Sequence, residues 1–510
     1  MQQNYISELC VYSSKKDDDF EFDFTLPEYL PGIARIIKTK IRFEKCVCHV
    51  ENGKVTMDAD ACISVLYTSD FGGKIKSALF RESLTLTFRD APVDECVLVP
   101  SCYVSSISSK PFGTRKLHTK FTLHASVLGT KTFSKALLCD SECDGICLNK
   151  EKISVCSKAS LPETVFDFDA ETAIDKEKPA IEEIIFTDAR VTHTRYECSD
   201  GVLRLEADIE AYVLYEISDD DGDTATYATA VFPTKIKQEL DNPNVNEKTL
   251  CTLYLDIVSL DSAVSFDPYG ENRLISFSLR YSVSGTLYNI GEFDITTDAF
   301  SERFEETPSI SKHSFECISC PVSTSEKVSA TIRGDFRDMY EISDVFTEIQ
   351  SVSYENTDSK HFATAKCVLH IFGTNENGEL CASDCPVTLH VPIKLSESAK
   401  GEVFPEVILC VSGCSATLKE GELSAEFIID VCGVFLYHSS MRIIEDISEN
   451  TEKPKDSRKG KVTIYYPSKD ESLWSIAKRY STNPERIKAS NSLESDSISG
   501  KHILIIPSIT

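Results

Sequence analysis

Residues 52–67 read NGKVTMDADACISVLY, and this stretch decides the fold. Asn52-Gly53 is a strong signal for a type I′ hairpin turn, because both central positions of that turn need a positive φ. From Val55 to Tyr67 every second residue is apolar or small, which is typical of a strand with one buried face. The stretch therefore predicts a β-hairpin whose second strand packs on a core.

The same pattern occurs again 148 residues further along the chain. Residues 31–67 align without a gap on residues 179–215, and twelve of the 37 positions are identical. Asp200-Gly201 takes the place of Asn52-Gly53, so a type I′ turn is expected there too. A third, degenerate copy has Val368–Gly373 at the position of the Val-Leu-Tyr strand, and its first hairpin turn is eroded. This is the signature of an internal repeat.

Each copy also closes on a strand that ends in Val-x-Gly, at Gly129, Gly285 and Gly433. We therefore predict a mainly β protein of three tandem β-sandwich-like units, followed by a small α+β domain. The units are expected at residues 1–138, 160–300 and 312–445, with polar connectors at 134–163 and 301–311. A flexible linker at 446–460 and a last domain at 461–510 complete the prediction, since charges, Ser and Pro dominate the linker.

The last domain is predicted to have the order strand, helix, helix, strand. Residues 461–466 and 502–507 are rich in β-branched residues, as strands are. Ser472 precedes an apolar stripe at helical spacing and is placed to cap it. Asn483-Pro484 marks a second helix start, because Pro is tolerated at the first helical position.

These residues resemble the LysM domain, a βααβ module that binds N-acetylglucosamine-containing glycans such as peptidoglycan. The likeness lies in Ser472–Ala477, Tyr480, Pro484, Asn491, Gly500 and Ile506-Pro507. It implies a glycan- or partner-binding rim made of loop residues, namely Asp470, Glu471, Ser472, Leu473, Ser497 and Ile498. Leu473, Trp474 and Ile476 are also expected in the core of the module. The family usually has Gly where Asp470 stands, so Asp470→Gly is predicted to raise glycan affinity.

Three β units followed by a LysM domain resemble the SPOCS-domain proteins, which assemble the envelope of bacterial endospores. Residues 26–37 and the 52–67 hairpin carry this likeness. The resemblance implies a non-enzymatic adaptor on the mother-cell side of the forespore surface. Its implied partners are a spore coat morphogenetic ATPase, peptidoglycan or N-acetylglucosamine oligomers, and further copies of the chain through self-association.

Net charge restricts the class of partner. The chain carries −28, whereas residues 461–510 hold seven Lys or Arg and five Asp or Glu, so the excess of negative charge lies in the β units. An acidic body repels phosphate backbones and anionic lipid, which argues against nucleic acid as a ligand. The N-terminus lacks the pattern of a secretory signal, and no apolar run is long enough to span a membrane. A cytoplasmic protein is therefore expected.

The sequence offers no motif for catalysis, for a metal or for a cofactor, and we predict none of the three. The twenty cysteines are expected as free thiols; oxidative cross-linking in a late assembly and metal binding are the alternatives. Two other functions remain open. One is a peptidoglycan-binding wall protein whose β units are a spacer, and the other is a wall hydrolase targeted by its LysM domain.

Overall fold

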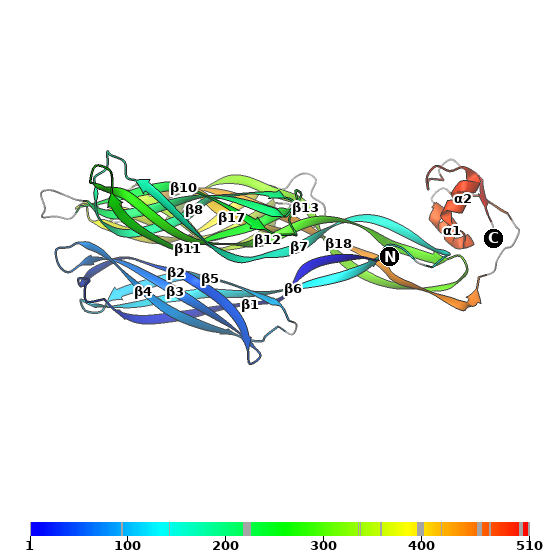
Figure 1. Cartoon of the computed structure of the whole chain (residues 1–510), viewed down its shortest axis with the longest axis horizontal. Coiled ribbons are helices and arrows are strands. Elements are labelled where there is room, and N and C mark those ends of the chain that lie inside the picture. Colours follow the sequence, from blue (N-terminus) through cyan, green and yellow to red (C-terminus); the bar gives the residue numbers. More distant parts are fainter. Residues whose placement is uncertain are drawn as a thin grey trace.

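The computed structural model describes residues 2–507 except 93–94, 142, 218–225, 335, 337, 358–359, 395–401, 420, 456–461, 469–470 and 499–502. The chain forms three units of six long strands each, with a small helical module at the C-terminal end (Figure 1). The prediction of a mainly β fold is confirmed.

The strands of the three units have the following bounds. The first unit consists of β1 (Gln2–Thr25), β2 (Ile33–Glu51), β3 (Lys54–Ser69), β4 (Ile75–Phe88), β5 (Val97–Pro111) and β6 (Lys116–Leu138). The second consists of β7 (Ile146–Ala173), β8 (Ile181–Ser199), β9 (Val202–Ile217), β10 (Tyr227–Asp241), β11 (Leu250–Phe266) and β12 (Asn272–Ser301). The third consists of β13 (Phe304–Ile332), β14 (Glu341–Thr357), β15 (Lys360–Thr374), β16 (Leu380–Ile393), β17 (Val403–Lys419) and β18 (Glu422–Pro454).

All three units share one topology. In each, the second, third and fourth strands form one antiparallel sheet, and the first, sixth and fifth form the other, in those orders. The repeat seen in the sequence is therefore a repeat of a two-sheet sandwich, and Val368–Gly373 does lie in the central strand of its sheet, β15.

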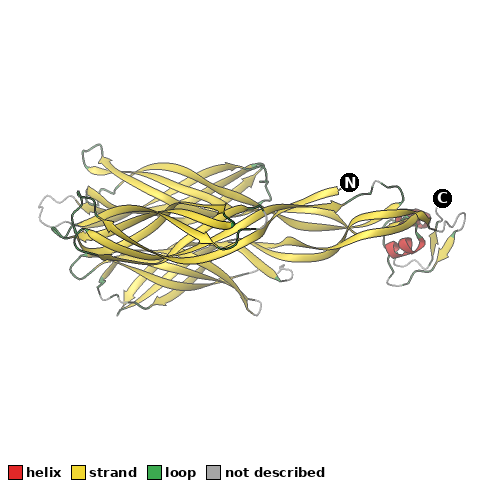
Figure 2. Ribbon diagram, turned by 90° about the horizontal axis from the view of Figure 1, so that it is seen from below, coloured by secondary structure: helices red, strands yellow, loops and turns green. Residues whose placement is uncertain are grey.

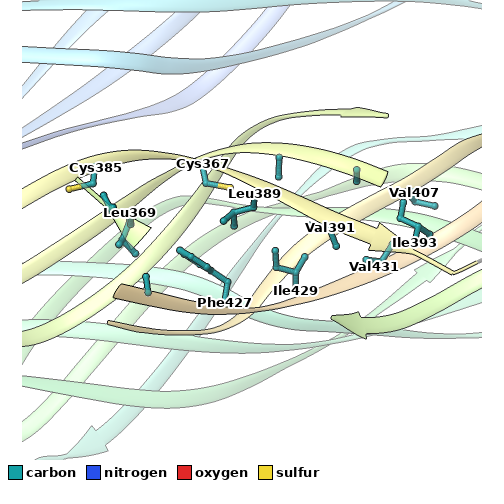
Figure 3. Close-up of a cluster of buried hydrophobic side chains, with 14 of the residues drawn as sticks. Cys367, Leu369, Cys385, Leu389, Val391, Ile393, Val407, Phe427, Ile429 and Val431 are labelled. Atoms are coloured by element: carbon teal, nitrogen blue, oxygen red, sulfur yellow. The ribbon is translucent and has the colours of Figure 1, made fainter. Parts of the chain in front are cut away.

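The buried faces follow the period-two pattern. Val55, Met57, Ala59, Ala61, Ile63 and Val65 on β3 are each no more than 1% exposed. In the third unit, Leu369, Val391, Phe427 and Ile429 fill the space between the two sheets in the same way (Figure 3). Alternation thus places one face of every central strand in the core of its sandwich.

The two predicted hairpin turns differ in conformation. Asn52 and Gly53 have φ of 50° and 73°, as a type I′ turn requires. At the second turn Gly201 has a positive φ but Asp200 does not, so the type I′ prediction is wrong there. Glycine at the second position alone supplies the left-handed residue that this turn needs.

The first and last strands of each unit continue beyond the sandwiches as paired ribbons that together form a stalk (Figures 1 and 2). We define the stalk as residues 2–10 with 130–138, 146–161 with 285–301, and 304–320 with 435–454. Its core joins all three ribbons, because Tyr5, Val155, Ile295, Phe315 and Ile443 belong to one buried cluster.

Most of the residues predicted as connectors and linker are instead parts of the strands that form the stalk. The sequence 134–163 is mostly the end of β6 and the start of β7, 301–311 is mostly the start of β13, and 446–454 is the end of β18. A two-stranded ribbon satisfies its backbone hydrogen bonds across the pair, so it can be highly polar without being a linker.

The three units pack in a cyclic order. β5 contacts β14, β11 contacts β2, and β17 contacts β8, so the fifth strand of each unit meets the second strand of another. Ion pairs also join the second strands to one another: Lys40 and Arg42 on β2 both pair with Asp188 on β8, and Arg190 Nη1 on β8 lies 3.3 Å from Asp344 Oδ2 on β14. In the part of the chain that the structure describes, no helix is long and apolar enough to cross a membrane.

Candidate functional site

The C-terminal module has the predicted order of elements. β19 (Thr463–Tyr465) pairs with β20 (Leu504–Ile506), and α1 (Leu473–Tyr480) and α2 (Pro484–Asn491) lie between them in sequence. The Ser472 side chain caps α1 by accepting from Ser475 N, and the Asn483 side chain caps α2 by accepting from Glu485 N. The capping residues recognised in the sequence therefore predicted the starts of both helices correctly.

A shared hydrophobic cluster joins the module to the stalk. Leu473, Ile476, Ala477, Ile487, Leu504 and Ile506 form its buried part together with Phe300 and Cys147 of the stalk. Phe300 is fully buried, and its ring centroid lies 5.0 Å from that of Trp474. The module is thus seated on the end of the stalk rather than separated from it, as Figure 1 shows at the right-hand end of the molecule.

Asp298 at the stalk tip binds one face of α1. Trp474 Nε1 donates to Asp298 Oδ2 at 2.7 Å, and Lys478 Nζ lies 2.5 Å from Asp298 Oδ1. Partial burial alone would raise the pKa of Asp298, but the hydrogen bonds and charge of Lys478 and Trp474 outweigh it and lower the pKa. Trp474, expected in the core of the module, is therefore an interface residue.

Glu302 binds the start of α2. Its side chain is 5% exposed, and Oε1 accepts from the backbone N–H of Asn483 at 2.7 Å, with Arg486 Nη1 3.8 Å away. An anion at a helix N-terminus is favoured by the unpaired N–H groups and the helix dipole. Asp298 of the stalk and Glu302, which follows the end of β12, thus contact both helices of the module.

The residues predicted to form the rim differ in their exposure. Ser472 and Ser497 are exposed, and Ile498 is partly buried against the core of the module. Leu473 is 1% exposed, so its assignment to a binding rim is wrong. It is the first residue of α1, and its side chain packs in the core of the module. Asp470 lies outside the described residues.

Glu471 has a structural role in the module. Its carboxylate accepts from Tyr465 Oη at 2.6 Å and pairs with Arg479 at 2.7 Å. The hydrogen bond from Tyr465 is the main cause of a lowered pKa for Glu471. Its carboxylate is therefore engaged within the module, and Ser472 and Ser497 are the exposed residues among those described of the predicted rim.

An apolar surface lies on the outer face of the β19–β20 sheet. Ile464 and Ile505 are a cross-strand pair, 62% and 41% exposed, and Val462, Tyr466 and Ile503 extend the same face, each at least half exposed. We call these five residues the outer apolar face. This face was not identified from the sequence, although the alternation in residues 462–466 places Val462, Ile464 and Tyr466 on one side of the strand.

The comparisons with known proteins agree with this geometry. Residues 468–507 match the LysM domain family. No curated protein and no solved structure matches the chain. The LysM module is of a type that binds N-acetylglucosamine-containing glycans such as peptidoglycan, and Ser472 and Ser497 of its predicted rim are exposed.

The described residues hold no candidate metal site. No three His, Cys, Asp or Glu residues in the described ranges are placed to hold a metal ion. All twenty cysteines are free thiols. The candidate site is therefore the surface of the LysM module, with two separate parts: the rim and the outer apolar face.

Proposed function

We propose that this protein is a non-enzymatic adaptor of the endospore envelope, which binds peptidoglycan-type glycan through its LysM module. The observation that carries the proposal is the seating of that module on the stalk through Asp298 and Glu302, with Ser472 and Ser497 left exposed. A binding module held at the end of a long acidic body is suited to joining a surface to other components. The resemblance to SPOCS-domain proteins supports the spore envelope as that setting.

Glycan binding is tested by calorimetry on the full chain with N-acetylglucosamine oligomers and muropeptides. We expect saturable binding that Ser497→Arg weakens at least tenfold, because the added side chain obstructs the rim. Ser490→Arg is the matched control, since Ser490 is exposed on α2 and outside the rim. Binding that is absent from the wild type, or equally reduced in both variants, would contradict the glycan proposal.

The outer apolar face supports a second candidate, recognition of a protein. Exposed apolar patches on otherwise polar proteins commonly mark protein contacts. We propose that this face binds the spore coat morphogenetic ATPase implied by the resemblance. Ile464→Asp is expected to abolish co-purification of the chain with that ATPase while glycan binding stays unchanged. Retained co-purification would assign the ATPase contact to another surface.

The proposed location is the mother-cell side of the forespore surface. A fluorescent fusion in sporulating cells is expected to form a shell around the forespore, and Ile464→Asp is expected to disperse it. The wall-hydrolase alternative predicts release of soluble muropeptides from purified peptidoglycan. We expect none, and such release would contradict the adaptor proposal.

A further inference from the structure

Two pairs of cysteine side chains meet where the two sheets of a sandwich come together. In the first unit Cys46 on β2 and Cys102 on β5 have their sulfur atoms 3.6 Å apart. In the second unit Cys198 on β8 and Cys251 on β11 have theirs 3.7 Å apart. Sulfur atoms at this separation are in van der Waals contact and have to move closer by under 2 Å to reach the disulfide length of about 2.0 Å.

Both pairs occupy the same junction of the repeated fold. The second strand is the edge of one sheet and the fifth strand is the edge of the other, and these two edges contact each other in every unit. The residues are not at equivalent sequence positions, since Cys46 pairs opposite Ala59 and Cys198 opposite Leu203. Two units therefore have a pair of thiols at the same junction, although their cysteines occupy different positions along the strands.

The third unit has half of such a pair. At the junction of β14 and β17, Thr347 Oγ1 lies 3.3 Å from Cys414 Sγ. The hydroxyl holds the place that the second sulfur has in the other units. The third unit thus has a Thr–Cys pair at the junction where the other two units have Cys–Cys pairs.

We propose that Cys46–Cys102 and Cys198–Cys251 are oxidation sites, which form disulfides within their units and fasten the two sheets of each sandwich. The co-reactant is a low-molecular-weight disulfide. A protein thiolate attacks one of its sulfur atoms, forms a mixed disulfide and releases one small thiol; the second protein thiolate then displaces the other. Two protein thiols and one small disulfide thus give one protein disulfide and two small thiols.

The first pair is placed to react sooner. Cys46 and Cys102 are both partly exposed, whereas Cys251 is 1% exposed. The hydrogen bond from Cys102 lowers the pKa of the Cys46 thiol, while burial raises the pKa of Cys198 and of Cys251. A larger thiolate fraction at Cys46 favours its attack on an oxidant.

The experiment treats the reduced, folded full-length protein with oxidised glutathione. Remaining thiols are then alkylated after denaturation and the peptides are mapped by mass spectrometry. We expect linked Cys46–Cys102 and Cys198–Cys251 peptides, with each disulfide lowering the mass by about 2 Da. The Cys46–Cys102 link is expected to form first. Recovery of these four cysteines in alkylated form, or their linkage to other partners, would overturn the proposal.

Variants make the assignment specific. Cys46→Ser is expected to remove the first link and leave the second, and Cys48→Ser, two residues further along β2, is expected to remove neither. Thr347→Cys is expected to give a third link, between position 347 and Cys414. The disulfides close loops of more than fifty residues, so oxidation is expected to raise the melting temperature by about 5 °C or more. Disulfides without such a rise would show that they do not fasten the sheets.

Discussion

At the residue scale, the Val-x-Gly ending of the repeated strand has a steric cause in the second and third units. A Cβ at Gly285 would lie 2.1 Å from the carbonyl oxygen of Thr252 on the neighbouring strand, and one at Gly433 would lie 2.3 Å from that of Glu406. Backbone atoms cannot rotate out of the way as side chains do. Glycine is therefore needed where two strands approach closely.

Gly285→Ala is expected to lower the free energy of unfolding by about 2–3 kcal/mol, because β11 has to shift to admit the methyl group. Urea denaturation followed by circular dichroism measures the change. Gly413→Ala is the control, since its nearest neighbour is the flexible end of Ile428 at 3.2 Å, and we expect a change below about 1 kcal/mol. Equal losses in the two variants would refute the steric explanation.

At the scale of the element, the LysM module shows how short helices are fixed by a neighbouring ribbon. α1 and α2 have eight residues each, which is too short for stable isolated helices. Phe300 completes their core, Asp298 binds two side chains of α1, and Glu302, just after β12, binds the N-terminus of α2. The end of β12 is thus part of the structure of the module.

Asp298→Ala is expected to loosen the module from the stalk, because it removes the acceptor for Trp474 and Lys478. A hydrogen bond to a charged group contributes about 1.5–3 kcal/mol, so undocking should become roughly tenfold more frequent or more. The lone tryptophan, Trp474, reports it directly through an increased rate of quenching by iodide.

Asp294→Ala serves as the comparison for that experiment, since Asp294 lies on the same strand outside the contact with α1. Its quenching rate is expected to equal that of the wild type. A wild-type quenching rate in Asp298→Ala would show that the apolar contact with Phe300 alone holds the module in place.

At the scale of the whole molecule, ion pairs join the three units although the chain is strongly acidic. Asp188 is 7% exposed and pairs with Lys40 and Arg42 of the first unit. Asp384 of the third unit pairs with Lys38 of the first. Basic residues of the first unit thus pair with carboxylates of the second and third units, which offsets part of the mutual repulsion of the acidic units.

These contacts predict a loss of stability in acid. Burial raises the pKa of Asp188 and of Asp384, but hydrogen bonds and ion pairs with Lys40 and Arg42, or with His370 and Lys38, outweigh burial and hold both pKa values well below their usual range. A carboxylate whose pKa is lower in the folded state stabilises the fold above its unfolded pKa. That stabilisation is lost as the pH falls toward the folded pKa.

The free energy of unfolding is therefore expected to fall from about pH 5 downward. Removing one partner of a buried ion pair costs about 3–5 kcal/mol, so Asp188→Ala should be destabilised by that order at pH 7 and less sensitive to acid. Denaturation by urea at pH 7, 5, 4 and 3 measures both effects. A parallel pH dependence in wild type and variant would exclude Asp188 as a source of the acid sensitivity.

The sequence by itself determined the features that depend on neighbours in the chain. Alternation in residues 55–67 predicted a strand with one buried face, the 148-residue repeat predicted equivalent units, and Ser472 and Asn483 marked both helix starts. The tertiary structure alone decided that residues 446–454 are strand, that the LysM module rests on Asp298 and Glu302, and that Cys46 meets Cys102. The reason is physical: periodicity and caps act within a few residues, whereas a contact between distant segments leaves no local pattern and depends on how strands of the whole chain are brought together.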